Sequence, residues 1–103
     1  MTKHHAVAEI IWQKPEQIQQ KLNLGQAIYA LNIRFEGVDG LWSVVLILED
    51  LIEIKSEQPQ LVKIGFLFPD QVKEFLVRDI HIEISEGPSS LIGTGKILKI
   101  ENM

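Results

Sequence analysis

The sequence predicts an all-β domain that forms a closed barrel or a sandwich. Apolar and polar residues alternate with a period of two in several short segments, which is the pattern of half-buried strands. About six such segments are separated by short stretches rich in glycine, proline and aspartate. No segment has the apolar spacing of a long helix, and 103 residues are enough for a single domain, residues 1–103.

The composition is that of a globular protein, with 46% hydrophobic and 23% charged residues. The net charge is −4 and the lysines and arginines are scattered, which argues against nucleic acid as a partner. There is no cysteine, so disulfides and thiolate chemistry are excluded. The first nine residues lack a secretory apolar run and no stretch approaches a membrane span, so we expect a cytoplasmic protein without a membrane partner.

The first strand is predicted over residues 7–12, an apolar run that ends before Pro15. Pro15 followed by an acidic residue is typical of a helix start, so a short helical turn is expected up to Leu22. Gly25 should end this turn.

The next two strands are predicted to form a hairpin. In residues 26–35 every second side chain is apolar: Ala27, Tyr29, Leu31, Ile33 and Phe35. Residues 36–40 contain two glycines around an aspartate, which is a turn composition. The second strand of the hairpin then begins near Trp42.

Residues 42–48 are apolar on both faces, and two explanations remain open. The strand is covered on both sides, or it presents a hydrophobic face to a partner. Aromatic residues in strand patterns are ordinarily core residues. If a partner surface does exist on this strand, we expect it to be formed by Trp42, Val44 and Leu46.

The middle of the chain is less regular. Residues 49–57 alternate charged and apolar side chains and are predicted as a loop or a ragged edge strand, ended by Pro59. Residues 61–68 are again a strand, ended by Pro69. A short loop or turn is expected over residues 71–77.

Two final strands are predicted over residues 79–85 and 91–100, joined by a turn over residues 86–90. Glycines within a strand indicate a tight bend or a close backbone approach, as at the corners of barrels. The structural glycines expected from this pattern are Gly87 in the turn and Gly93 and Gly95 in the last strand.

No residues are predicted to be catalytic, to bind a cofactor or to bind a metal. One strand carries four polar side chains on one face: Asp79, His81, Glu83 and Ser85. Neighbours on such a face lie about 6.6 Å apart, which is too far for a proton relay. Residues 90–97 lack the first glycine and the hydroxyl residue of a phosphate-binding loop. His4 and His5 lie in an N-terminal segment, residues 1–5, that we expect to be frayed.

Three motifs follow one another in the second half of the chain: a proline after a strand, a strand that ends in a Glu-Gly turn, and a closing strand with a Gly-x-Gly. They are Phe66-Leu67-Phe68-Pro69, residues 80–84 with Ser85-Glu86-Gly87, and Leu91-Ile92-Gly93-Thr94-Gly95-Lys96-Ile97. In these motifs the chain resembles the C-terminal β-barrel domain of elongation factor Tu and related translation GTPases. Residues 8–11 and 36–40 are more weakly similar to the opening portion of that barrel.

The resemblance implies a six-stranded Greek-key barrel, without the GTPase domain of that family and its nucleotide-binding motifs. We therefore expect a non-catalytic protein-interaction module that binds another protein or a second copy of itself. One alternative is a mimic of the elongation factor barrel that binds a factor-directed protein such as a toxin or inhibitor. Another is binding of transfer RNA or the ribosome. Only the expected fold supports it, since the family's Arg-Pro-Gln stretch is missing around residues 27–34.

Overall fold

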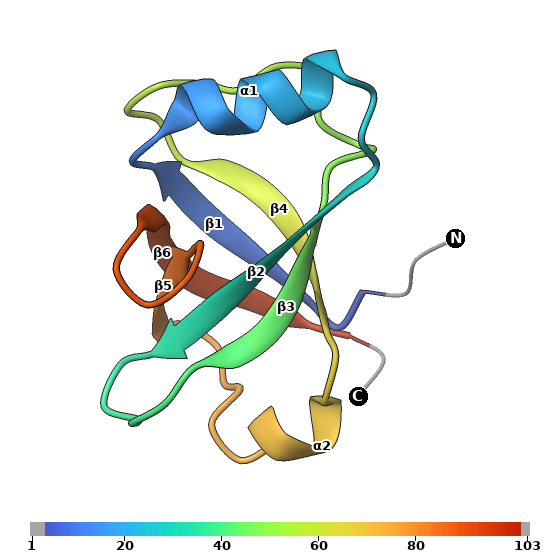
Figure 1. The fold of residues 1–103 in the computed structure, drawn as a ribbon. Helices are drawn as coiled ribbons and strands as arrows, with labels where there is room; N and C mark the ends of the chain where they lie inside the picture. Colours follow the sequence, from blue (N-terminus) through green and yellow to red (C-terminus); the bar gives the residue numbers. More distant parts are fainter. Residues whose placement is uncertain (1–3, 102–103) are drawn as a thin grey trace.

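The computed structural model describes residues 4–101, and these form a closed barrel of six antiparallel strands in the order β1-β4-β3-β2-β5-β6 (Figure 1). Each strand has a hydrogen-bonded neighbour on both sides. The elements are β1 Ala6–Trp12, α1 Pro15–Asn23, β2 Ile28–Phe35, β3 Trp42–Ile47, β4 Gln60–Phe66, α2 Pro69–Val72, β5 His81–Ser85 and β6 Leu91–Ile100. Of the two predicted architectures, the barrel is therefore confirmed.

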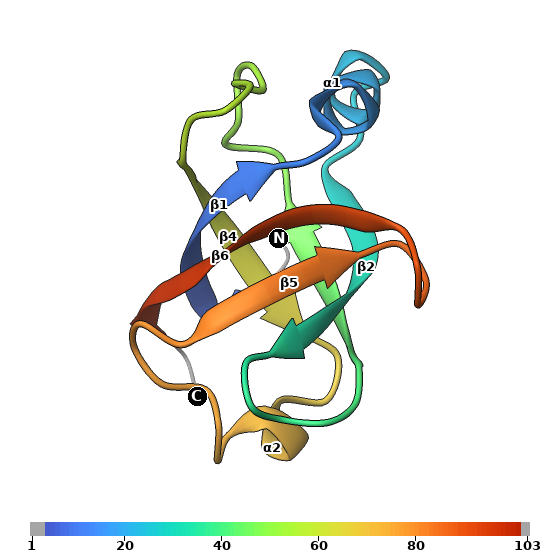
Figure 2. The ribbon, with the colours of Figure 1, turned by 90° about the vertical axis from the view of Figure 1, so that its left-hand side faces the viewer.

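The chain follows a Greek-key path. Strands β2, β3 and β4 are consecutive neighbours. Strand β1 precedes them, is joined to β2 by the long connection through α1, and lies beside β4. Strand β5 then pairs with β2, and β6 closes the barrel between β5 and β1 (Figure 2). The closing strand β6 spans the ten residues predicted for it, whereas the predicted loop after Phe68 contains the one-turn helix α2.

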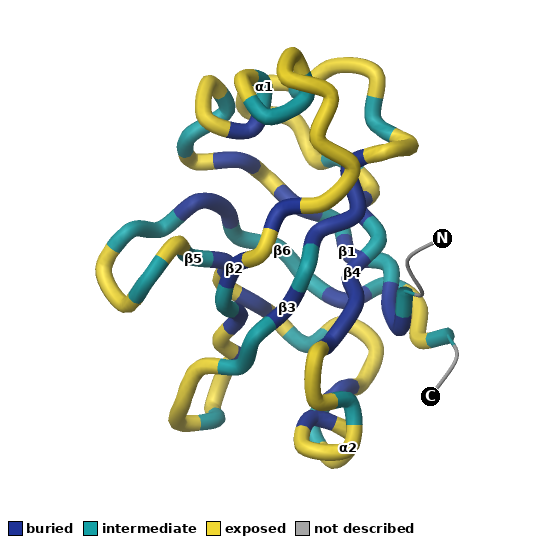
Figure 3. The backbone as a smooth tube through the Cα atoms, turned by 45° about the vertical axis from the view of Figure 1, so that its right-hand side comes forward, coloured by how far each residue is buried: buried dark blue, intermediate teal, exposed yellow. Residues whose placement is uncertain are grey.

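The core is the inward face of the strands. On β2 the predicted apolar face is confirmed, because Tyr29, Leu31, Ile33 and Phe35 are buried while Ile28 and Arg34 are exposed. The same alternation of buried and exposed residues is visible along the tube in Figure 3. Burial of these apolar side chains is the main favourable contribution to folding.

The two helices cover opposite ends of the barrel (Figure 1). Helix α1 begins with Pro15, whose missing N–H would have no partner there, and it buries Ile18 completely. It ends at a Schellman motif: Gly25 has a φ of 76° and donates to Leu22 O, while Gln26 N donates to Lys21 O. The expectation that Gly25 ends this helix is confirmed.

The expectation of a frayed N-terminal segment is wrong for His4 and His5, and residues 1–3 lie outside the described part. His5 is buried, and its Nδ1 accepts a hydrogen bond of 2.9 Å from Phe66 N. His4 Nε2 lies 2.7 Å from Glu101 Oε2. These residues are held because the pairing of β1 and β4 continues past Ala6, where His5 N donates to Ile64 O.

Candidate binding groove

The partner surface expected on β3 is not formed as predicted. The side chains of Val44 and Leu46 are completely buried, because they point into the barrel between β2 and β4. Trp42 is half-buried, and its ring centre lies 4.9 Å from that of Phe75 and 5.8 Å from that of Phe35. Strand β3 is thus apolar on both faces because it is largely covered on both, and Ile47 on its outer face is only 2% exposed.

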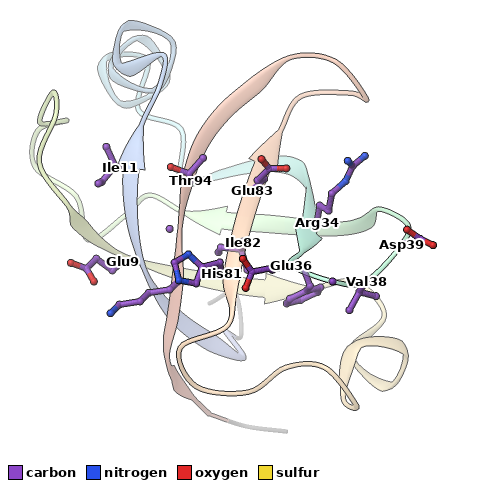
Figure 4. Close-up of a pocket in the computed structure, with 14 residues that line it drawn as sticks. Glu9, Ile11, Arg34, Glu36, Val38, Asp39, His81, Ile82, Glu83 and Thr94 are labelled. Atoms are coloured by element: carbon purple, nitrogen blue, oxygen red, sulfur yellow. The ribbon is translucent and has the colours of Figure 1, made fainter.

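An open groove of about 890 Å³ crosses the outer surface of β1, β6, β5 and β2 and continues onto the turn between β2 and β3 (Figure 4). Its lining residues are Glu9, Ile11, Arg34, Phe35, Glu36, Gly37, Val38, Asp39, His81, Ile82, Glu83, Thr94, Gly95 and Lys96. A volume of this size is within the range of about 300–1,000 Å³ typical of binding pockets.

Strand register brings the polar groove residues together in two rows. In the first row Glu9 is paired with Lys96, and Lys96 with His81. In the second row Ile11 is paired with Thr94, Thr94 with Glu83, and Glu83 with Arg34. Directly paired residues of neighbouring antiparallel strands have Cβ atoms about 5 Å apart. Residues that are up to 87 positions apart in the sequence, such as Glu9 and Lys96, therefore share one surface.

The charges of the groove are partly balanced. Glu9 faces Lys96 and Glu83 faces Arg34 on neighbouring strands, which places opposite charges side by side. The turn between β2 and β3 adds two more exposed carboxylates, Glu36 and Asp39. Four carboxylates thus line the groove against one arginine and one lysine, so the groove carries a net negative charge.

The turn that carries these carboxylates has a defined backbone. Val38 N donates to Phe35 O at 3.1 Å, and Gly37 has a φ of 78°, which favours glycine. Glu36 N donates to His81 O at 2.9 Å and so fixes the turn to β5. Gly40 lies over Trp42, whose Cη2 would be 3.3 Å from an added Cβ. The turn therefore packs through Gly40 on Trp42, which is in contact with Phe35 and Phe75.

The last strand crosses β1 closely because of its glycines. A Cβ on Gly95 would lie 1.8 Å from Glu9 O, and one on Gly93 would lie 2.9 Å from Ile10 Cγ2. Strand β6 also has register shifts against both β1 and β5, which increase its bend. Gly87, in the turn before β6, has a φ of 76°. Gly95, which lines the groove, therefore lies at the point where β6 approaches the backbone of β1 most closely.

The polar face of β5 lies in this groove. His81 and Glu83 are exposed, whereas Asp79 precedes the strand with a φ of 68° and donates its N–H to Ile97 O. Within residues 4–101 no three histidine or acidic side chains are close enough to hold a metal ion. No helix in the described part of the chain has the length and apolar character needed to cross a membrane.

Sequence reasoning identified the outer face of β5 but missed the groove as a whole. Arg34 occupies an outer position of β2, which the period-two pattern does indicate, whereas Thr94 and Lys96 lie on β6, where buried and exposed residues do not alternate regularly. Their proximity follows from strand order, for which the local pattern contains no signal. A search of known families, curated proteins and solved structures found no match to this chain. Its class therefore comes from its own fold, a closed six-stranded antiparallel barrel with an open outer groove.

Proposed function

We propose that this protein is a non-catalytic binding module that holds a segment of another protein in the outer groove. The observation that carries the proposal is the groove itself, which spans four adjacent strands of a barrel whose interior is filled by side chains. Because side chains fill the interior of the barrel, a ligand binds on the outer surface. The partner surface therefore lies on β1, β6, β5 and β2 and replaces the one expected on β3.

The resemblance to the C-terminal barrel of elongation factor Tu remains part of this proposal, and the closed six-stranded antiparallel barrel supports it. A mimic of that barrel would compete with the factor for a shared partner. The groove chemistry favours a protein partner over transfer RNA or ribosomal RNA, because four carboxylates against two cations repel phosphates.

The experiment is affinity capture of the tagged protein from lysate of its own source, with nuclease treatment, using two tryptophan variants. Thr94→Trp fills the centre of the groove, whereas Ala30→Trp adds the same side chain at an exposed outer position of β2 outside the groove. We expect a stoichiometric partner that is captured by the wild type and by Ala30→Trp and lost with Thr94→Trp. Both variants should keep the circular dichroism spectrum and melting temperature of the wild type.

Equal capture by the wild type and Thr94→Trp would exclude the groove as the binding site. Capture that disappears after nuclease treatment would instead support the RNA alternative. If light scattering finds only a dimer of this chain, and Thr94→Trp is also dimeric, the partner-binding proposal fails.

A further inference from the structure

The two ends of the groove differ in chemistry. At the β1 end Ile11 is 38% exposed, although it is a large apolar side chain. The turn between β2 and β3 presents two exposed carboxylates: that of Asp39 lies at the opposite end of the groove, and that of Glu36 lies nearer the middle, beside His81 (Figure 4). Figure 4 shows Ile11 and Asp39 on opposite sides, with Glu83 and His81 between them.

The middle of the groove contributes little net charge. Glu83 is paired with Arg34 across β5 and β2, and Glu9 with Lys96 across β1 and β6. No groove carboxylate has an ion pair of 4 Å or less with any residue from 4 to 101, but Glu9 and Glu83 each face a cation on the neighbouring strand, whereas the turn over residues 36–40 contains no cation. The negative charge available to a ligand is therefore concentrated at the turn.

The distance between the two ends limits the length of the ligand. The second row runs from Ile11 on β1 to Arg34 on β2 across three strand spacings, and neighbouring strands lie about 4.8 Å apart, so its ends are about 14 Å apart. Asp39, on the turn, lies beyond Arg34 (Figure 4). An extended peptide rises about 3.4 Å per residue, so four or five residues span the second row, and a lysine or arginine side chain extends from there to the turn.

On the basis of the proposed function, we propose that the ligand is an extended segment of the partner protein with an apolar side chain and a lysine or arginine four or five residues apart. The apolar side chain packs on Ile11, and the basic side chain forms an ion pair with Asp39, while Glu36 adds to the negative charge of the turn. A cation at these carboxylates makes charge-assisted hydrogen bonds, which are stronger than neutral ones. The charge-balanced centre tolerates the neutral peptide backbone.

The inference is tested with a displayed library of random nine-residue peptides selected against the purified wild-type protein. Enriched peptides should contain an apolar residue and a lysine or arginine at the proposed spacing. The affinity of a synthetic, fluorescently labelled copy is then measured by anisotropy. Because the contact is ionic, raising the salt from about 50 to 300 mM should weaken binding several-fold.

The decisive variants reverse the charge of the turn. With Glu36→Lys and Asp39→Lys together, binding of the enriched peptide should weaken about tenfold or more, since double-mutant cycles give energies of this size for close charge pairs. The double variant Glu53→Lys and Glu74→Lys makes the same change in net charge at exposed positions outside the groove and should bind normally. A peptide with its basic residue replaced by glutamate should regain affinity for the turn variant.

The outcomes separate this inference from the proposed function. If enriched peptides lose binding to Thr94→Trp but not to the charge-reversed turn, the groove is the binding site and the basic ligand is wrong. If they bind both variants equally, the groove itself is wrong. Failure to enrich any peptide with the proposed pattern overturns the inference, and the lysate capture then decides the proposed function independently.

Discussion

The pKa of the buried Tyr29 side chain is changed by its surroundings. Tyr29 is 8% exposed, donates a hydrogen bond to a carboxylate oxygen of Glu86, and has Lys21 Nζ 4.8 Å from its ring centre. Burial, followed by the hydrogen bond and charge of Glu86, raises the pKa of Tyr29 from 10.0 to about 12. The folded-state pKa is raised, so this contribution to stability is fully present below pH 10 and is lost as the pH rises through about 12.

The ionisation of Tyr29 can be measured directly, because it is the single tyrosine of the chain. Absorbance at 295 nm should titrate near pH 12 in the folded protein and near pH 10 in urea. Glu86→Gln should lower the folded-state pKa while keeping it above 10, since burial is the largest cause. A folded wild type that titrates near pH 10 would show that Tyr29 is not held in this environment.

Gly95 is the residue on which the close crossing of β6 and β1 depends. Gly95→Ala should destabilise the protein by about 3 kcal/mol or more, because the new Cβ would lie 1.8 Å from Glu9 O and backbone would have to move. Gly87→Ala is the matched control: no atom lies within 4 Å of its added Cβ, so only its positive φ is unfavourable, at about 1–2 kcal/mol. Urea denaturation gives both values, and equal losses would contradict the close crossing.

At the scale of elements, the long connection between β3 and β4 is held by two glutamine side chains. Gln60 Oε1 accepts hydrogen bonds from Trp12 Nε1 and Lys55 N, and Gln60 Nε2 donates to Glu53 O. Gln19 on α1 accepts from Ile54 N. The predicted irregular segment is therefore a loop whose backbone is fixed to β4 and α1.

Gln60→Ala should destabilise the protein by about 1–3 kcal/mol, because it leaves the N–H of Trp12, which is 3% exposed, without its partner. Amide hydrogen exchange at Lys55 should accelerate as the loop loses its attachment. Gln58→Ala, at an exposed position of the same loop, should change neither quantity. Unchanged exchange at Lys55 in Gln60→Ala would show that the backbone of the loop is held by other contacts.

At the scale of the whole molecule, the barrel is closed where the two ends of the described chain meet. Glu101 N donates to His5 O at 2.7 Å, and the Glu101 side chain is ion-paired with Lys99 and hydrogen-bonded to His4 Nε2. The radius of gyration is 12.5 Å, close to the value of about 13 Å expected for one domain of this length. Hydrogen bonds with Lys99 and then His4 lower the pKa of Glu101.

The pH dependence of this closure has a defined sign. Because the folded-state pKa of Glu101 is lowered, its contribution to stability is present above the ordinary value of 4.5 and is lost as the pH falls through the folded-state pKa. Glu101→Gln should therefore lower the urea midpoint at pH 7, and the two proteins should become equal at the acid end. A constant difference at all pH values would mean that the charge of Glu101 is not the cause.

Several elements could be predicted because their signal lies within a few residues of sequence. The alternation in β2, the turn that follows it and the glycine at the end of α1 depend on local backbone geometry. Val44 and Leu46 were harder, because an apolar strand looks the same whether its second face is covered by protein or exposed. His5 was placed in a frayed segment for a similar reason, since its partner Phe66 is 61 residues away.

By itself, the sequence determined the β class of this protein, most of its strands and the side chains that the alternating strands β2 and β5 turn inward, because a period of two is a property of one strand. Only the tertiary structure decided that β1, β6, β5 and β2 are neighbours and that their outer residues form a groove ending at Asp39. Strand order depends on which distant segments close the barrel. The strand order is determined by the packing of the whole core, so no single segment of the sequence indicates it.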